Sequence, residues 1–225
     1  MFIHPLSSDA IPSILFRAER RSKTSFRDGS TCARQTMYTG PPTRYDFDSH
    51  KAWKRKSTRF RSFGTWGRAM QHRAHLQEKG ISDVVVVAVW ARGLMGVYSA
   101  EEAATKLGYN DMGLTGMDPD ERRKIRHHWN EYLVEGGIAA DEYRILAIFE
   151  GGGPDRVVDF EWPEYRLRSS MAIPRDFFPG RRSGNALVDI ACEIYSYCGV
   201  WDDMKRDQLV KAMTRSPFLS MMRYS

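Results

Sequence analysis

The strongest hydrophobic pattern in the chain is the continuous run DVVVVAVW at residues 83–90. An uninterrupted apolar run of this length, rich in β-branched residues, is typical of a strand that is buried on both faces. Shorter apolar segments predict further strands at 14–17, at 59–63, at 131–134 and at 143–149. Because these segments lie far apart along the chain, the sequence predicts a sheet assembled from distant strands.

Helical signals separate the strands. The segment WGRAMQHRAHLQEKG at 66–80 predicts a helix that ends at a glycine. In SAEEAATKLG, Ser99 and Glu102 form a capping box, and the terminal glycine suits a left-handed C-cap. A third helix is predicted to begin at Asp118 in DPDERRKIRHHW, with a proline at its first position. The mixture of elements predicts the α+β fold class.

Two long segments lack a clear periodicity of hydrophobic residues. Residues 20–59 are polar and contain several glycines and prolines, which predicts a long excursion with little regular structure. The last part of the chain begins with a segment rich in proline and arginine, after which two helices are predicted near 185–198 and 203–214. We therefore expect an α+β domain at 1–160, and a linker with a C-terminal helical tail at 161–225.

The net charge of the chain indicates the kind of partner that it would bind. The 225-residue chain has a formal net charge of +6, which favours anionic partners. Basic residues concentrate at 51–73, a stretch without an acid in which aromatic side chains alternate with lysine and arginine. Such a stretch is either a solvated basic face or a phosphate-binding surface, so nucleic acid is an alternative partner.

The sequence also addresses the compartment. No apolar run approaches the length of a bilayer-spanning helix, and the N-terminus lacks a signal-peptide pattern. The three cysteines form no CxxC pair, which favours a reducing compartment. We expect an intracellular protein, cytoplasmic or nuclear, without membrane contact, unless a leader peptide has been removed. His72 and His75 lack a third ligand at metal spacing, so no metal site is predicted.

Four polar residues stand at the ends of predicted elements. Arg17 closes the first strand, where alternation can turn its guanidinium inward. Ser62 and Thr65 lie at a strand-to-helix turn, and Thr65 suits helix capping. Glu131 opens a strand directly after a basic helix, although a negative charge near a helix C-terminus is unfavourable. Solvent exposure or capping explains each position alone, but their order along the chain suggests a common site.

An arginine at the end of the first strand, a serine on a strand leading into a helix, and a glutamate opening a late strand resemble the Arg-Ser-Glu arrangement of ADP-ribosyltransferases. The segments LFRAE, SHKAWKRKSTRFRSFGTWGRAMQHRA, DVVVVAVWARGLMGVYSAEEAATKLG and NEYLVEGGI are similar to an uncharacterised family of fungal proteins with an ADP-ribosyltransferase-like fold. The resemblance covers roughly residues 13–150. It implies a split β-sandwich with flanking helices and a C-terminal helical extension, and a central cleft that binds NAD as a substrate.

The resemblance also implies a role for each candidate. Arg17 would hold a phosphate or a ribose hydroxyl of NAD. Ser62, helped by Thr65, would order the strand and the nicotinamide ribose. Glu131 would be the catalytic residue, accepting a hydrogen bond from a ribose hydroxyl and stabilising the positive charge that develops as nicotinamide leaves. The implied activity is mono-ADP-ribosylation of a macromolecular acceptor, a protein or a nucleic acid.

The chain departs from the pattern of that superfamily at two places. Many active members carry Ser-Thr-Ser where this chain has Ser-Phe-Gly at 62–64, and arginine-modifying members carry Glu or Gln where this chain has Trp129. Glu135 and Glu142 are rival carboxylates for the role given to Glu131. The departures leave open a binding or scaffold module without chemistry, and the basic stretch at 51–73 leaves open a nucleic-acid-binding domain.

Overall fold

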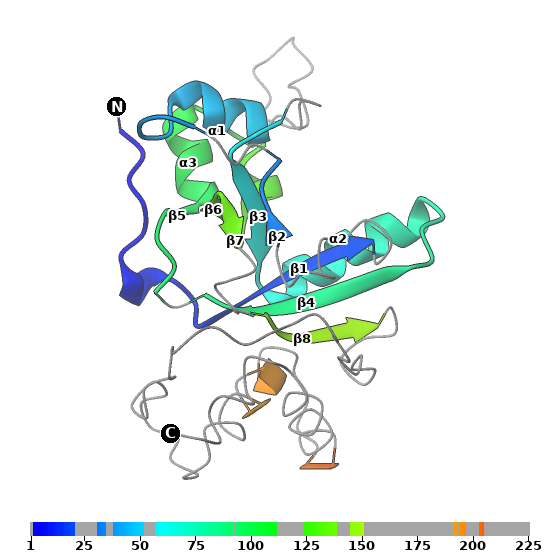
Figure 1. Ribbon diagram of the computed structural model, residues 1–225. Helices are drawn as coiled ribbons and strands as arrows, with labels where there is room; N and C mark the ends of the chain where they lie inside the picture. Colours follow the sequence, from blue (N-terminus) through cyan, green and yellow to red (C-terminus); the bar gives the residue numbers. More distant parts are fainter. Residues whose placement is uncertain are drawn as a thin grey trace, which may run out of the picture.

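The computed structural model describes residues 2–20, 31–34, 38–51, 57–91, 93–111, 124–138, 145–150, 191–192, 194–196 and 203–204. Figure 1 shows the elements along the chain, and their bounds are η1 (Ser8–Ala10), β1 (Ile14–Arg20), β2 (Thr31–Cys32), α1 (Arg44–Lys51), β3 (Phe60–Gly64), α2 (Trp66–Glu78), β4 (Val84–Trp90), β5 (Val97–Ser99), α3 (Ala100–Leu107), η5 (Ile125–His128), β6 (Glu131–Glu135), β7 (Gly137–Ile138) and β8 (Ile145–Glu150). The combination of helices with strands is that of an α+β protein, as the sequence predicts.

The strands form one large antiparallel sheet and one small one. The large sheet has six strands in the order β5-β6-β3-β1-β4-β8, and the small sheet pairs β2 with β7. Each pairing is antiparallel. Strands adjacent in space are thus distant in sequence, because β1 lies between β3 and β4.

The large sheet is divided at the junction between β1 and β3. β1 pairs with β4 along its whole length, from Ile14 opposite Trp90 to Arg20 opposite Val84. In contrast, β1 and β3 are paired only where Phe16 lies opposite Gly64. We call this junction the seam. Figure 1 shows β3 leaving the seam in a direction well away from that of β1, with β6 and β5 beyond it.

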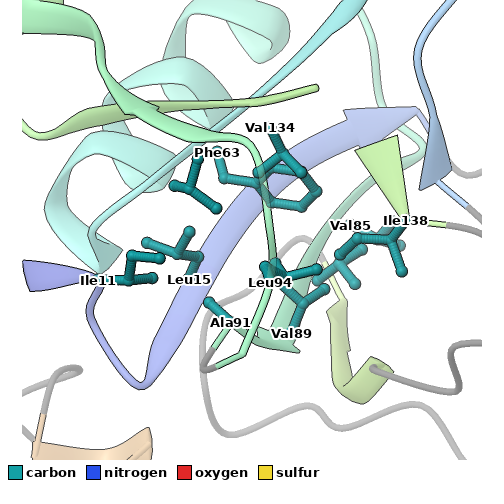
Figure 2. Close-up of a cluster of buried hydrophobic side chains, with 11 residues drawn as sticks. Ile11, Leu15, Phe63, Val85, Val89, Ala91, Leu94, Val134 and Ile138 are labelled. Carbon is teal, nitrogen blue, oxygen red and sulfur yellow. The ribbon is translucent and has the colours of Figure 1, made fainter. Parts of the chain in front are cut away.

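One hydrophobic cluster joins the two halves of the sheet. Figure 2 shows Leu15 from β1, Val85 and Val89 from β4, Phe63 from β3 and Val134 from β6 gathered around a common centre. These side chains are buried. Burial of this apolar surface is the main force that holds the halves together across a seam with little strand pairing.

A second cluster lies on the opposite face of β3 and β6, under α1 and α3. Phe47 of α1 is fully buried and stacks on Phe60 of β3, with ring centroids 4.6 Å apart. Tyr98 of β5 and Leu133 of β6 belong to the same cluster. α1 is therefore anchored over this face of the sheet by an aromatic contact, and this fixes where its last residues lie.

The strands read from hydrophobic period are present, but β1 continues to Arg20, so Arg17 lies within the strand and does not close it as predicted. The run at 83–90 forms β4, whose residues are all buried. The helix predicted at 66–80 is α2. At α3 the N-cap half of the predicted capping box is present, in which Ser99 Oγ accepts from the Glu102 amide at 3.2 Å, whereas the Glu102 carboxylate pairs with Lys106. Gly108 occupies the left-handed C-cap position with φ of 85°. These features depend on local sequence, which explains why the sequence predicts them.

The prediction of little regular structure over residues 20–59 was wrong, because this segment contains β2 and α1. The sequence of α1 is mostly polar because the helix buries only part of its surface, so its hydrophobic pattern was too weak to predict a helix. Its first turn is stabilised by Asp46, whose carboxylate accepts from the amide and the hydroxyl of Thr43, both at 2.7 Å. A single large apolar side chain, Phe47, docks the helix on the sheet.

Other predictions fall partly outside the described residues. The start of the helix expected at Asp118 lies outside them, and the described end of that segment, Ile125–His128, is a 3-10 helix. Most of the expected tail at 161–225 also lies outside, apart from short helical stretches. In the part of the chain that the structure describes, we find no helix with the length and apolar character needed to cross a membrane.

Candidate functional site

Arg17 is held at the seam by two contacts. Its Nη1 donates to the backbone carbonyl of Ser62, and its Nε donates to the carboxylate of Glu19. Glu19 also accepts from Arg61 of β3. Burial alone would raise the pKa of Glu19, but the charges of the two arginines outweigh it and the pKa is lowered. Arg17 is therefore oriented by a charged network that connects β1 to β3.

Ser62 contacts a histidine that the sequence analysis did not select. The Oγ of Ser62 lies 2.7 Å from Nε2 of His50, and Nδ1 of His50 lies 2.6 Å from Oγ1 of Thr58. Burial lowers the pKa of His50 to about 4, so its ring is neutral near pH 7. A neutral imidazole has one donor and one acceptor nitrogen, so one of the two hydroxyls donates to the ring. Ser62 is thereby fixed in orientation.

The position of His50 follows from the packing of α1. His50 is three residues after Phe47, so both side chains lie on the same side of the helix. The His50 ring meets Phe60 edge-on, with centroids 5.8 Å apart. Because Phe60 and Ser62 are two positions apart on β3, they point to the same face, and the histidine that packs on one reaches the other.

Glu131 is the first residue of β6 and is nearly buried, with 11% of its side chain exposed. Its Oε2 lies 3.0 Å from Nδ1 of His128, a residue that is only 1% exposed, and 3.8 Å from Nη2 of Arg68. Burial alone would raise the pKa of Glu131. The hydrogen bond from His128 and the charges of Lys51, His128 and Arg68 outweigh it and lower the pKa to about 2.

The surroundings of Glu131 explain how an ionised carboxylate can occupy a position after a basic helical segment. A carboxylate next to the end of a basic helical segment would be unfavourable in isolation. Here that segment supplies His128, which donates to the carboxylate. The result is a buried anion that is stabilised in part by a hydrogen bond from the element that precedes it.

The turn before Glu131 is held against the end of β3. Asn130 has a positive φ of 55°, and its carbonyl accepts from the Thr65 amide at 3.2 Å. Gly64 lies directly opposite Glu131 in the strand pairing. A Cβ on Gly64 would lie 2.7 Å from Cγ of Arg68 and 3.0 Å from the carbonyl oxygen of Asn130. The glycine in Ser-Phe-Gly thus makes room for Arg68 beside the carboxylate.

Thr65 occupies the N-cap position of α2, as predicted, but its side chain makes no capping hydrogen bond. Its carbonyl accepts from the Ala69 amide at 3.0 Å. The role that the resemblance gives to the Thr65 hydroxyl stays a prediction.

Arg17, Ser62 and Glu131 lie at adjoining positions. Ser62 shares a face of the sheet with Glu131 through its side chain and contacts Arg17 through its backbone. Ser62 lies opposite Leu133, two residues from Glu131, so the hydroxyl and the carboxylate share a face of the sheet. Arg17 meets Ser62 at its backbone carbonyl. The positive charge of Arg17 lowers the pKa of His50 and the negative charge of Glu131 raises it, so His50 lies within electrostatic reach of both.

The rival carboxylates have other surroundings. Glu135 forms an ion pair with Arg59 and accepts from the Tyr98 hydroxyl at 3.2 Å. Arg59 is only 4% exposed and lies beneath the Tyr38 ring, 3.8 Å from its centroid. This arrangement is that of a structural ion pair. Glu142 lies outside the described residues.

Four cations of the basic segment at 51–73 have roles inside the molecule. Among its described cations, Lys51 and Arg59 are buried, Arg61 is paired with Glu19, and Arg68 donates to the carbonyl of His127. These four side chains therefore serve the fold and the site, and a phosphate-binding role for the segment would depend on its other residues.

Sequence reasoning missed His50, His128 and Arg68 as site residues. The signal for His128 was its position three residues before Glu131, the spacing at which the two now interact. The signal for His50 was its place shortly before the strand that carries Ser62. Within the described ranges there is no group of three or more His, Cys, Asp or Glu side chains suited to a metal ion.

Comparison with models of known protein families yields no match, and a search of curated proteins likewise finds no similar sequence. The function is therefore inferred from the geometry of the residues around the seam.

Proposed function

We propose that the chain is an NAD-dependent mono-ADP-ribosyltransferase that modifies a macromolecular acceptor, and that its divided sheet is a split β-sandwich of the ADP-ribosyltransferase-like kind. One observation carries the proposal. A buried, ionised carboxylate at Glu131 shares a face of two paired strands with the oriented hydroxyl of Ser62, next to the seam where Arg17 is fixed.

The chemistry of these groups suits NAD. A guanidinium has five N–H donors and matches phosphate geometry, and the contacts of Arg17 to Glu19 and Ser62 use its Nε and Nη1. Hydroxyl and carboxylate oxygens suit the hydroxyls of a ribose. Arg17 would bind a phosphate or a ribose hydroxyl, and Ser62, held by His50, would order the nicotinamide ribose.

The reaction breaks the glycosidic bond between nicotinamide and ribose. As nicotinamide leaves, positive charge develops on the ribose in an oxocarbenium-like transition state. A fixed anion is most useful where such charge develops, because it is already oriented before the reaction begins. Glu131 meets this requirement, since its pKa of about 2 keeps it ionised at neutral pH.

The test is nicotinamide release and transfer of labelled ADP-ribose from NAD, with a lysate supplying acceptors. Glu131→Gln should preserve the fold and lower the rate by about 100- to 1000-fold. Glu102→Gln is the matched control, because Glu102 is an exposed carboxylate on α3 paired with Lys106. Unchanged turnover in Glu131→Gln, or no turnover of NAD by the wild-type protein, would contradict the proposal.

A second candidate function is a binding module that retains the fold without the chemistry. It is favoured by the network that already engages Arg17 and by Ser-Phe-Gly at 62–64. Thermal unfolding with NAD separates it from a scaffold that does not bind NAD, because ligand at 100 times its Kd stabilises the native state by about 2.7 kcal/mol. Stabilisation without nicotinamide release would support the binding module.

A further inference from the structure

Lys51 is a buried ammonium whose charge the proposed reaction does not use. It is the last residue of α1, directly after His50, and is 1% exposed. Its Nζ has no hydrogen-bond partner among the residues that the structure describes. A buried ammonium without a hydrogen bond is destabilising, so a protein that keeps one requires a physical reason.

The charged groups within electrostatic reach of Lys51 come from β6, from α2 and from its own helix. Glu131 at the start of β6 stabilises its charge, and Arg68 of α2 opposes it. Within α1, the charge of Lys51 helps to keep His50 neutral. His128 of η5 and Lys51 both lower the pKa of Glu131.

Burial lowers the pKa of Lys51 to about 8, an effect that the attraction of Glu131 only partly offsets. The side chain is therefore mainly charged at pH 7 and loses its proton just above that pH. His128 and Arg68 remain beside Glu131 when this happens, at 3.0 Å and 3.8 Å from its Oε2. The carboxylate thus stays ionised whether or not Lys51 is charged.

We propose that Lys51 is a positioning residue that restrains Glu131 electrostatically, so that loss of the Lys51 charge increases the stabilisation that the carboxylate gives to a developing cation. This inference rests on the proposed transferase function. A positive charge near the ribose destabilises the positive charge that develops there, whereas the negative charge of Glu131 stabilises it. The α1 helix therefore supplies both a neutral ring that orients Ser62 and a cation that moderates Glu131.

The experiment compares wild type with Lys51→Met, which removes the charge and fills the space with an apolar side chain of similar length. The kcat for nicotinamide release at pH 7 should rise by about three- to tenfold in Lys51→Met. In wild type, kcat should rise as pH passes through about 8, the pKa of Lys51. In Lys51→Met this rise should be absent. Lys106→Met on α3 is the control and should behave as wild type.

Two readouts do not need NAD. In Lys51→Met, the midpoint for protonation of the Glu131 carboxyl, followed by NMR, should move to higher pH by about 1 pH unit. Lys51→Met should also melt higher than wild type at pH 7. That advantage should shrink between about pH 8 and 10.5, because the wild type gains stability as Lys51 loses its proton in the native state.

These readouts distinguish a failure of the inference from a failure of the proposed function. An unmoved Glu131 midpoint in a folded Lys51→Met protein overturns the inference, and so does a fall in kcat at pH 7. If wild type does not turn over NAD while the midpoint moves as expected, the restraint on Glu131 stands and the transferase function fails. Lys51→Gln provides a second neutral variant should Lys51→Met not fold.

Discussion

Gly64 of β3 and Glu131 of β6 lie directly opposite each other, and the absence of a side chain at Gly64 leaves room for Arg68 beside the carboxylate. The stem of Arg68 occupies the space that a Cβ at Gly64 would need. The guanidinium of Arg68 then lies 3.8 Å from Glu131. A serine at this position would conflict with that arrangement.

The first prediction concerns this contact. Gly64→Ala should destabilise the protein by about 1–3 kcal/mol, because the new Cβ would lie 2.7 Å from Arg68 Cγ and force a shift. Gly67→Ala is the matched control in α2, since nothing lies within 4 Å of its would-be Cβ. An alanine there should be neutral or stabilising by up to about 1 kcal/mol. Denaturant unfolding measures both, and equal stabilities would contradict the prediction.

The second prediction concerns His128 and acid stability. The pKa of Glu131 is lowered from 4.5 to about 2, so its contribution to stability is fully present above pH 4.5 and is lost as pH falls toward 2. That contribution is on the order of 3 kcal/mol. His128→Gln removes the largest group that lowers this pKa, so the variant should lose less stability than wild type on acidification.

Unfolding free energies measured from pH 7 down to pH 3 would check this prediction. His75→Gln is the control, because His75 is exposed on α2 and lies 3.8 Å from Glu78, far along the helix from the site. If His128→Gln and wild type lose stability in parallel, Glu131 does not depend on His128.

A third prediction follows from the neutral ring of His50. Its pKa is lowered from 6.5 to about 4, so the stability it contributes is present above pH 6.5 and is lost as pH falls toward 4. In that window, wild type should lose more stability than His50→Gln. His50→Gln should also bind NAD about fivefold more weakly, since Ser62 loses a hydrogen bond of about 1 kcal/mol that orients it. Calorimetric titration with NAD at pH 7 measures the affinity, and unchanged binding would count against a role for Ser62.

The fourth prediction separates the two carboxylates of β6. Glu135→Gln removes the charge that pairs with Arg59, a side chain that is 4% exposed. Asp46, 3.8 Å from Arg59, offsets part of the remaining charge, so the loss should cost about 3 kcal/mol, which thermal or denaturant unfolding would detect. The folded fraction of Glu135→Gln should retain nicotinamide release, whereas Glu131→Gln should not. The opposite result would assign the chemistry to Glu135.

Local sequence determined much of the fold. The apolar period located β1, β3, β4, β6 and β8, and the capping residues located α3, because both signals are contained in short windows of the chain. The same approach missed α1, whose burial depends on one phenylalanine that packs against a strand formed later in the chain. The sequence order of Arg17, Ser62 and Glu131 was sufficient to select them as candidates.

Only the tertiary structure decided what surrounds those candidates. The pairing of β3 with β6 sets Glu131 opposite Gly64, and the docking of α1 brings His50 to Ser62 and Lys51 into reach of the carboxylate. The ionisation state of Glu131 follows from this placement, since burial alone would raise its pKa and the neighbouring His128, Lys51 and Arg68 lower it. Electrostatic effects act through space between residues that are distant in sequence, so no local pattern contains them.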